Sequence, residues 1–271
     1  MGTLDGKTVF VTGAARGQGR SHAIKLAGEG ADIIAVDICA QIPTVEYAMA
    51  TRDDMDVTIK EVEKLGRAIV ASEADVRDPD ALSHALAQGE ATIGRRVDIV
   101  LANAGIMPLG IEINTHQAFL DVIDVNLTGV HNTVTAAVPS LLANNGGSIV
   151  ITSSSQGLKG TGGMGGVNAA YTAAKHGVVG LMRNYANWLS PKGIRVNTVH
   201  PTGVATPMIQ NPQLEKFYSD PNVDFDAVRN IMPVPFIEPA DVSAAIAFLV
   251  SDAGRYITGV TFPVDAGFNA R

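Results

Sequence analysis

The segment TVFVTGAARGQG, which runs from Thr8 to Gly19, decides the fold because it joins a short apolar run to a glycine-rich turn. The β-branched and aromatic residues of Thr8–Thr12 predict a buried strand, and Gly17–Gly28 predicts the helix after it. Glycines let the chain turn tightly and bring backbone N–H groups close to a phosphate, and the positive end of the helix faces that charge. The spacing G-x-x-x-G-x-G differs from the common G-x-G-x-x-G, so the position between strand and helix carries the interpretation as a dinucleotide site. The residues expected to bind a pyrophosphate there are Gly13, Arg16, Gly17, Gln18 and Gly19.

Short apolar runs alternate with helix-like stretches along the rest of the chain. The predicted strands are Thr8–Thr12, Ala31–Val36, Arg67–Ala71, Val97–Leu101, Ser148–Thr152, Arg195–Val199 and Val260–Val264. The predicted helices are Gly17–Gly28, Arg52–Leu65, Pro79–Ile93, Asn114 to about Ala143, Ala170–Leu189 and Pro239–Val250. We expect Pro139 to bend or shorten the fourth of these helices. Continuous apolar strands separated by helices predict a doubly wound, Rossmann-type parallel sheet of about seven strands with helices on both faces, in a single α/β domain over residues 1–271.

Composition excludes several classes of function. Hydrophobic residues make up 46% of the chain and charged residues 17%, which is typical of a globular protein. The net charge of −7 speaks against a nucleic-acid or anionic-membrane partner. The single cysteine, Cys39, allows no internal disulfide, and the polar stretch from Met1 to Lys7 does not look like a signal peptide, so we expect a cytoplasmic protein. The six histidines show no close paired spacing, so no metal site is expected.

The residue after the second predicted strand indicates which cofactor is bound. Asp37 lies about twenty residues beyond the glycines, where a carboxylate accepts hydrogen bonds from adenosine ribose hydroxyls and repels a 2′-phosphate. Arg16 argues for NADP, because a cation in the glycine loop could pair with that phosphate. A carboxylate and a phosphate dianion repel each other strongly, so we expect NAD. Further residues expected to contact the cofactor end the third and fourth strands: Asp75, Val76, Asn103, Ala104 and Gly105.

A tyrosine and a lysine four positions apart indicate proton-transfer chemistry. Tyr171 and Lys175 begin a predicted helix and lie on one face of it. An adjacent ammonium lowers the pKa of a phenol, so we expect Tyr171 to exchange a proton with an alcohol or a nascent alkoxide. Upstream, the run Thr152–Ser155 ends the fifth strand, where a hydroxyl can hydrogen-bond the reacting oxygen. Spacing alone does not say which of its three serines faces the site.

These motifs together resemble the short-chain dehydrogenase/reductase family over essentially the whole chain. The motifs that carry the resemblance are TGAARGQG, Asp37, the DV at Asp75, the NAG at Asn103, Asn126, the serine run, YTAAK, and Pro201 to Thr206. The resemblance implies that Ser154 is the catalytic serine, that Tyr171 is the acid/base, and that Lys175 binds the nicotinamide ribose and tunes the tyrosine. It also implies that Asn126 holds a water in a proton relay to Lys175. In the proline-glycine segment, Thr202 replaces the usual first glycine, and the implied cofactor contacts are Pro201, Val204 and Thr206.

Two long connections suggest a narrower assignment. The insertion at about 39–54, together with GAARGQGRSHA and VDIC, resembles the mycofactocin-associated, carveol-dehydrogenase-like branch of the family. That resemblance implies tightly bound NAD and an external redox acceptor of the mycofactocin type; the family commonly forms homotetramers. The apolar residues of the insertion are Ile42, Pro43, Val45, Tyr47, Ala48 and Met49. We expect part of this set to be buried over the adenosine; a tetramer contact or a packed surface loop is the alternative. We expect the segment at about residues 206–239 to form a substrate flap.

The apolar residues of the flap suggest what it binds. They are Met208, Ile209, Leu214, Phe217, Tyr218 and Phe225, with Ile231 and Met232 beyond them. They favour a cyclic or terpenoid-like, carveol-type secondary alcohol, although they could equally be packing residues. An NADP-linked ketone reductase and a non-catalytic nucleotide-binding regulatory protein on the same fold are the rival functions. The complete set of Asn126, Ser154, Tyr171 and Lys175 favours an NAD-dependent oxidoreductase, since a pure binding protein needs none of them.

Overall fold

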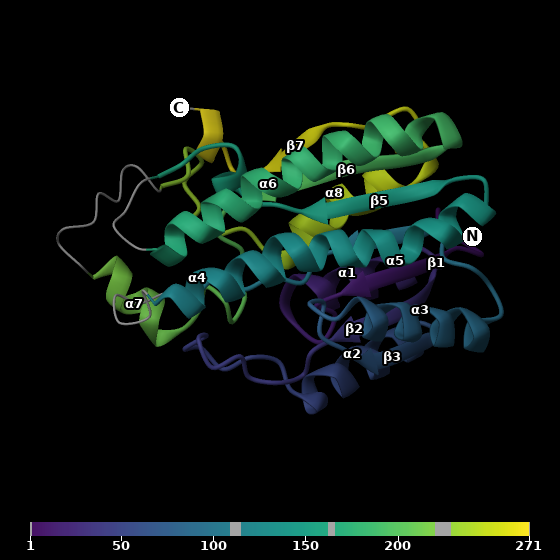
Figure 1. The fold of residues 1–271 in the computed structure, drawn as a ribbon, viewed down its shortest axis with the longest axis horizontal. Helices are drawn as coiled ribbons and strands as arrows, with labels where there is room; N and C mark the ends of the chain where they lie inside the picture. The colour runs from purple at the N-terminus through teal and green to yellow at the C-terminus, as the bar shows by residue number, and fades with distance from the viewer. Residues whose placement is uncertain (1, 109–114, 162–165, 220–228, 271) are drawn as a thin grey trace.

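The computed structural model describes residues 2–108, 115–161, 166–219 and 229–270. Strands and helices alternate along the chain (Figure 1). The strands are β1 (Thr8–Thr12), β2 (Asp32–Asp37), β3 (Ile69–Glu73), β4 (Ile99–Ala102), β5 (Gly147–Thr152), β6 (Ile194–Pro201) and β7 (Thr261–Val264). The α-helices are α1 (Gly17–Gly28), α2 (Arg52–Lys64), α3 (Pro79–Ile93), α4 (His116–Ile123), α5 (Gly129–Ala143), α6 (Gly166–Leu189), α7 (Pro212–Tyr218) and α8 (Pro239–Val250).

The strands form one parallel sheet, in the order β3-β2-β1-β4-β5-β6-β7. The chain builds outward from β1 to β3, crosses back to β4, and then builds outward in the other direction to β7. The strand order therefore reverses between β1 and β4, and in such sheets ligands bind at the carboxyl ends of the strands beside this reversal. The predicted doubly wound sheet of seven strands is confirmed for the described residues.

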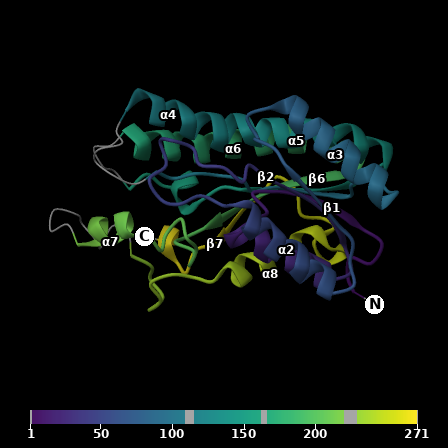
Figure 2. The ribbon, with the colours of Figure 1, turned by 90° about the horizontal axis from the view of Figure 1, so that it is seen from below.

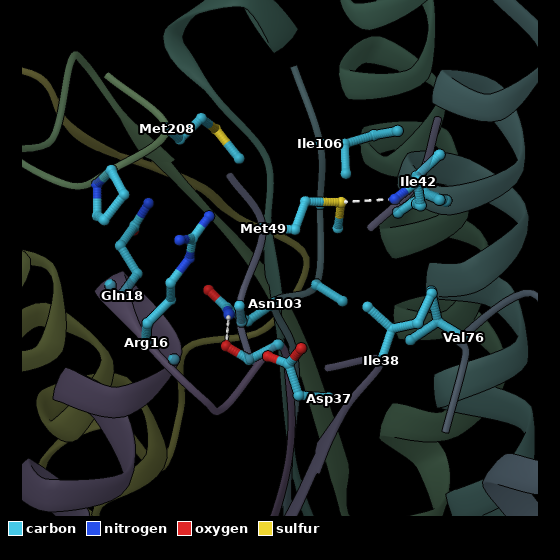
Figure 3. Close-up of a pocket in the computed structure, with 18 of the residues that line it drawn as sticks. Arg16, Gln18, Asp37, Ile38, Ile42, Met49, Val76, Asn103, Ile106 and Met208 are labelled. Carbon is cyan, nitrogen blue, oxygen red and sulfur yellow. Dashed lines mark hydrogen bonds between the residues drawn. The ribbon is translucent and has the colours of Figure 1, made fainter. Parts of the chain in front are cut away.

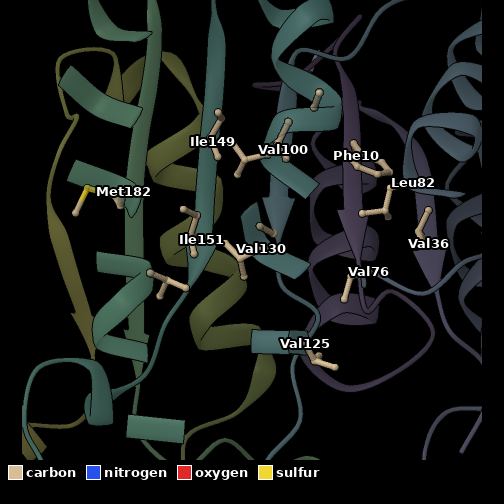
Figure 4. Packing of buried hydrophobic residues seen from close by; sticks show 14 of the residues in the cluster. Phe10, Val36, Val76, Leu82, Val100, Val125, Val130, Ile149, Ile151 and Met182 are labelled. Atoms are coloured by element: carbon tan, nitrogen blue, oxygen red, sulfur yellow. The ribbon is translucent and has the colours of Figure 1, made fainter. Parts of the chain in front are cut away.

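Helices cover both faces of the sheet, so strand residues are buried on both sides. Figure 2 shows α3, α4, α5 and α6 on one face and α2 and α8 on the other. Alternate strand residues supply the two cores: Phe10 and Ile149 pack under the first layer, whereas Val9 and Val150 pack under the second. Figure 4 shows the first of these cores, where side chains from neighbouring strands meet Val125 and Val130. This two-sided burial explains why the strands are apolar without interruption.

The turn after β1 requires glycine for two separate reasons. Gly13 has a φ of +69°, a conformation that costs other residues energy. A Cβ added to Gly19 would lie 1.9 Å from the main-chain oxygen of Gly13, so a side chain there cannot be accommodated without moving the backbone. The turn brings the start of α1 directly against the end of β1.

The long helix expected from Asn114 to Ala143 is wrong as a single α-helix. Asn114 lies outside the described residues, and α4 and α5 are separated by a π-helical segment, Asp124–Thr128. Asn126 in this segment exchanges two hydrogen bonds with the backbone of Ile106, at 2.8 and 2.7 Å. π-Helical turns are common at functional sites, and this one depends on a contact that a helical pattern does not reveal. Pro139 lies inside α5 and does not shorten it.

Most other predicted boundaries differ from the structure by one or two residues, and two differences are instructive. The strand predicted at Arg67–Ala71 is β3, at Ile69–Glu73, because its pairing with β2 runs from Ile33↔Ile69 to Asp37↔Glu73. The helix predicted from Ala170 begins at Gly166. Within the described residues, no helix is both long enough and apolar enough to cross a membrane.

Candidate active site

A cleft of about 870 Å³, counting the space at its open mouth, lies at the carboxyl ends of β1, β2 and β4. The predicted site residues that line it are Gly13, Arg16, Gly17, Gln18, Gly19, Asp37, Asp75, Val76, Asn103, Ala104, Gly105 and Thr206. Figure 3 shows Arg16 and Gln18 on one side of the cleft and Ile38, Ile42 and Val76 on the other. Most of the predicted cofactor residues are therefore brought together in one place.

The glycine loop presents backbone amides to this cleft. Arg16 is the N-cap residue of α1, and its side chain accepts no hydrogen bond from the first turn of the helix. Gly17, Gln18 and Gly19, the first residues of α1, line the cleft at the positive end of the helix dipole, where the first amides of a helix have no partner within it. This arrangement suits a pyrophosphate.

Asp37 is held in place by backbone amides at the end of β2. Its two carboxylate oxygens accept hydrogen bonds from the amide of Ala15 at 3.0 Å and the amide of Cys39 at 3.1 Å. Burial raises the pKa of this carboxyl above its usual value, while the two amides and the nearby Arg16 act in the opposite direction. Asp37 thus lies in the cleft wall in a fixed orientation, with acceptor capacity left for a ligand hydroxyl.

Arg16, the residue that argued for NADP, is already engaged. Its Nη2 donates a hydrogen bond to the main-chain oxygen of Ala48, at 2.6 Å. Ala48 belongs to the insertion at 39–54, so the guanidinium joins the glycine loop to the insertion across the mouth of the cleft.

The insertion is a packed loop with fixed contacts. Ile42, Val45 and Tyr47 are buried, and Ile42, Tyr47 and Met49 line the cleft. The hydroxyl of Thr44 donates to Asp121 of α4 at 2.6 Å, and the amide of Met107, after β4, donates to the hydroxyl of Tyr47 at 3.3 Å. The expected burial of this apolar set is confirmed for these three residues, and the contacts with α4 and with Met107 hold the loop against the cleft.

Asp75 and Asn103 line the cleft and also form hydrogen bonds with other residues of the protein. Both carboxylate oxygens of Asp75 accept hydrogen bonds from Arg77, the shortest at 2.6 Å. The amide group of Asn103 donates to the main-chain oxygen of Thr12 at 3.0 Å and so connects the ends of β4 and β1. These hydrogen bonds fix the part of the cleft wall where contacts with the cofactor were expected.

The three serines that follow β5 differ in their hydrogen-bond partners. Ser153 is turned away, because its hydroxyl donates to the main-chain oxygen of Lys175 at 2.8 Å. Ser154 accepts a hydrogen bond from the amide of Gln156 at 3.1 Å, and its side chain lies close enough to the phenol of Tyr171 to lower the pKa of that phenol. Ser155 opens a short 3₁₀ turn. Ser154 is therefore the serine that the fold places beside the tyrosine.

Tyr171 and Lys175 are both buried on one face of α6. The Nζ atom of Lys175 lies 5.5 Å from the centre of the Tyr171 ring and donates to the main-chain oxygen of Thr152 at 2.8 Å. Burial raises the pKa of the Tyr171 phenol, and the bond to Ser154 opposes that rise. Burial also lowers the pKa of Lys175 to about 8. The pKa of the phenol is therefore shifted upward, whereas the sequence predicted a lowered pKa; loss of solvent is the main cause of the rise.

Asn126 lies next to the lysine across a glycine. A Cβ added to Gly105 would be 3.2 Å from the side-chain oxygen of Asn126 and 3.6 Å from Nζ of Lys175. The side chain of Asn126 forms two bonds to Ile106, which leave one acceptor position and one N–H donor of its amide group for other partners. Gly105 connects this group to the cleft, which it also lines.

The segment after β6 reaches the cleft only in part. Thr206 lines the cleft, and its methyl group is close enough to Gly17 that an added Cβ would be 3.3 Å away. Pro201 is buried at the end of β6, and Val204 is buried in the core beneath α8, so neither side chain is part of the cleft wall. Thr202, at the unusual position, donates from its hydroxyl to the side-chain oxygen of Asn230 at 2.7 Å and so links β6 to the end of the flap.

In the described part of the flap, some side chains line the cleft or are buried and others are exposed. Met208 lines the cleft and Leu214 is buried, whereas Ile231 and Met232 are exposed. Phe225 lies outside the described residues, as do the side chains of Phe217 and Tyr218. Sequence reasoning missed Ile38, Ile106 and Pro207 as cleft residues; each directly follows a predicted motif, which is the signal that could have identified them.

Comparisons with known proteins agree with this geometry. The family described as "Enoyl-(Acyl carrier protein) reductase" matches residues 13–269. An oxidoreductase of Mycobacterium tuberculosis is 52% identical over 98% of this chain and 97% of its own length. The (−)-trans-carveol dehydrogenase of Rhodococcus erythropolis is 48% identical over 98% of this chain and 99% of its own length. The crystal structure of carveol dehydrogenase from Mycobacterium avium in complex with NAD is similar at a TM-score of 0.93 and 44% identity, with both chains covered completely.

Proposed function

Because this chain belongs to the short-chain dehydrogenase/reductase family and is an oxidoreductase, we propose that it transfers a hydride between NAD and a secondary alcohol or ketone. The observation that carries the proposal is the contact of Ser154 with the phenol of Tyr171, next to a cleft built for a dinucleotide. NAD supplies the group that gives or accepts the hydride. The residues of the chain bind it, orient the substrate and move the proton.

Tyr171 is the proposed acid and base. Burial keeps its phenol protonated at neutral pH, which suits proton donation to the alkoxide formed in ketone reduction. Ser154 holds the reacting oxygen beside the phenol. Lys175, whose pKa is lowered to about 8, remains largely charged at neutral pH and is the group that would bind the nicotinamide ribose. Asn126 completes the buried group beside Gly105.

NAD is the proposed cofactor in preference to NADP. Asp37 presents a carboxylate in the cleft wall, and the guanidinium of Arg16 is bonded to Ala48. A 2′-phosphate placed there would meet the carboxylate and would need Arg16 to leave its present partner.

The proposed substrate is an apolar cyclic secondary alcohol of the carveol type. Support comes from the carveol dehydrogenases named above and from Ile106 and Met208, which give the cleft an apolar wall. The test is a panel of cyclic and linear secondary alcohols, assayed with and without added NAD in the presence of an artificial electron acceptor. We expect carveol and other cyclic terpenoid alcohols to be oxidised fastest. Equal rates for short linear alcohols would contradict the substrate proposal and leave the reaction class intact.

Retention of NAD by the insertion is part of the proposal. Contacts from the insertion to Arg16, Asp121 and Met107 cover one side of the cleft, so the loop must move before the cofactor can leave. Protein purified without added cofactor should carry NAD(H), and an external acceptor of the mycofactocin type would reoxidise it in place. Shortening residues 39–54 to a tight turn should speed exchange. Protein that purifies empty and turns over freely with added NAD would contradict retention.

A homotetramer in the cytoplasm remains a prediction from the family resemblance. Sedimentation equilibrium of the purified chain measures the assembly directly, and a monomer would contradict it.

A further inference from the structure

A buried histidine on β6 makes a contact that the proposed reaction does not use. His200 is 0% exposed and lies at the end of the strand, next to Pro201. Its Nδ1 atom is 2.8 Å from the main-chain oxygen of Ser154, and its Nε2 atom is 2.8 Å from the hydroxyl of Thr198. The structure places it directly behind Ser154, the serine beside Tyr171.

The hydrogen-bond partners determine which ring nitrogen carries the proton. A carbonyl oxygen only accepts, so the proton must be on Nδ1 for the bond to Ser154 to form. Burial lowers the pKa of His200 to about 4, so the ring is neutral near pH 7 and Nε2 is an acceptor. The hydroxyl of Thr198 therefore donates to Nε2, which at 2.8 Å is closer than its other acceptor, the main-chain oxygen of Val260 at 3.4 Å. A directed chain runs from Thr198 through His200 to the backbone of Ser154.

The backbone of Ser154 is fixed from both sides by β6. The amide of Ser153 donates to the main-chain oxygen of Val199 at 2.9 Å, and the oxygen of Ser154 receives the histidine. The same oxygen also accepts from the amide of Gly157 at 2.9 Å, where the chain turns away. With both lone pairs engaged, the peptide plane after Ser154 cannot rotate without breaking a buried bond. The direction of the Ser154 side chain follows from that plane.

We propose that His200 is a positioning residue, which holds the hydroxyl of Ser154 at the phenol of Tyr171 through the backbone carbonyl of Ser154. The proposal rests on the proposed function, because it assigns a purpose to the placement of a serine that the reaction uses. His200 itself touches neither cofactor nor substrate; it acts only through Ser154.

Two variants of similar size separate this function from simple core packing. His200→Asn places an amide donor close to the position of Nδ1, whereas His200→Gln extends its amide towards Thr198 and leaves the oxygen of Ser154 without its partner. The measurements are kcat and KM with carveol, or with the panel alcohol that the parent oxidises fastest, and the melting temperature. Because small misplacements in an active site cost up to about 100-fold in rate, we expect His200→Gln to lower kcat by roughly 10-fold or more. His200→Asn should retain at least about a third of kcat, and KM for NAD should stay within about two-fold of the parent value in both variants.

A second pair covers the case in which either histidine variant does not fold. Thr198→Val removes the donor that orients the ring, and Thr198→Ser keeps it. We expect a lower kcat for the valine variant alone. Equal kcat losses in the asparagine and glutamine variants, or parent-like kcat in both glutamine and valine variants, would overturn the proposal.

Ser154→Ala tests the proposed active site itself, and so distinguishes a failure of that site from a failure of the positioning function of His200. If Ser154→Ala is strongly impaired while His200→Gln keeps the parent kcat, only the positioning function fails. If Ser154→Ala itself keeps the parent kcat, the proposed site is wrong and the positioning function falls with it.

Discussion

The guanidinium of Arg16 and the main-chain oxygen of Ala48 lie 2.6 Å apart, so a residue of the glycine loop holds the insertion after β2. The two segments are separated in sequence by the whole of α1 and β2. Their bond joins two segments that both line the cleft, and it engages the cation that would otherwise have favoured NADP.

Removing this bond should change how fast the cofactor exchanges. In Arg16→Met the insertion loses one anchor, and a hydrogen bond to a charged group is worth about 1.5–3 kcal/mol, less where the group is partly exposed. We expect NAD release to speed up by roughly 5- to 10-fold, measured by the fluorescence of bound NADH after mixing with excess competitor. If Arg16 holds the loop closed, association should accelerate as well. Faster release with unchanged association would instead indicate direct contact with the cofactor. The exposed Arg96, which precedes β4 at the amino ends of the strands and so lies away from the cleft, provides the matched control Arg96→Met.

Loss of the phenol hydroxyl should abolish turnover and spare binding. In Tyr171→Phe the ring remains to pack in the core, while the proton-transfer group, worth about 10²- to 10⁴-fold in rate, is gone. Steady-state assays with the best panel alcohol measure kcat, and titration calorimetry measures NAD affinity. Tyr185→Phe, elsewhere on α6, is the control and should leave kcat unchanged. Turnover near the parent rate in Tyr171→Phe would end the assignment.

The charge of Asp37 should set the preference for NAD. Asp37→Asn keeps an acceptor for one backbone amide and removes the charge, and Asp37→Ser also opens space for a phosphate. We expect the ratio of kcat/KM for NAD to that for NADP to fall by at least about 10-fold in both variants, because one unfavourable charge pair at short range is worth over 1 kcal/mol. A parent enzyme that uses NADP as well as NAD would show that Asp37 does not decide the cofactor.

Burial of the charged Lys175 should lower the free energy of unfolding at neutral pH, and loss of its proton at higher pH should restore it. Its pKa is lowered to about 8 in the folded protein, from 10.5, so between these values the unfolded chain binds more protons and the parent gains stability as pH rises. At pH 7 the buried charge carries its full cost, and Lys175→Met should be more stable than the parent. The difference should narrow by about 2 kcal/mol between pH 7 and pH 10. Urea unfolding of both proteins, freed of nucleotide, measures it. The exposed Lys64 gives the control Lys64→Met, which removes a lysine ammonium that is not buried. A constant difference for Lys175→Met would contradict the lowered pKa.

Local pattern was enough to predict the sheet and much of the site. The glycine spacing predicted the turn after β1, the position of Asp37 predicted a carboxylate in the cleft wall, and the four-residue spacing predicted that Tyr171 and Lys175 share a face of α6. Each of these depends on residues close together in the chain, or on a strand end that the parallel topology carries to the same edge of the sheet.

Other features depend on contacts between distant segments, which a pattern does not contain. The choice among three serines follows from Ser153 bonding to α6, and the partner of Arg16 follows from the path of the insertion. The π-helical turn at Asn126 follows from its bonds to Ile106. The pKa of Tyr171 rises chiefly because the folded core removes water from the phenol. Periodicity and spacing determine which residues share an edge or a face, whereas burial and hydrogen-bond partners arise only when the segments pack together.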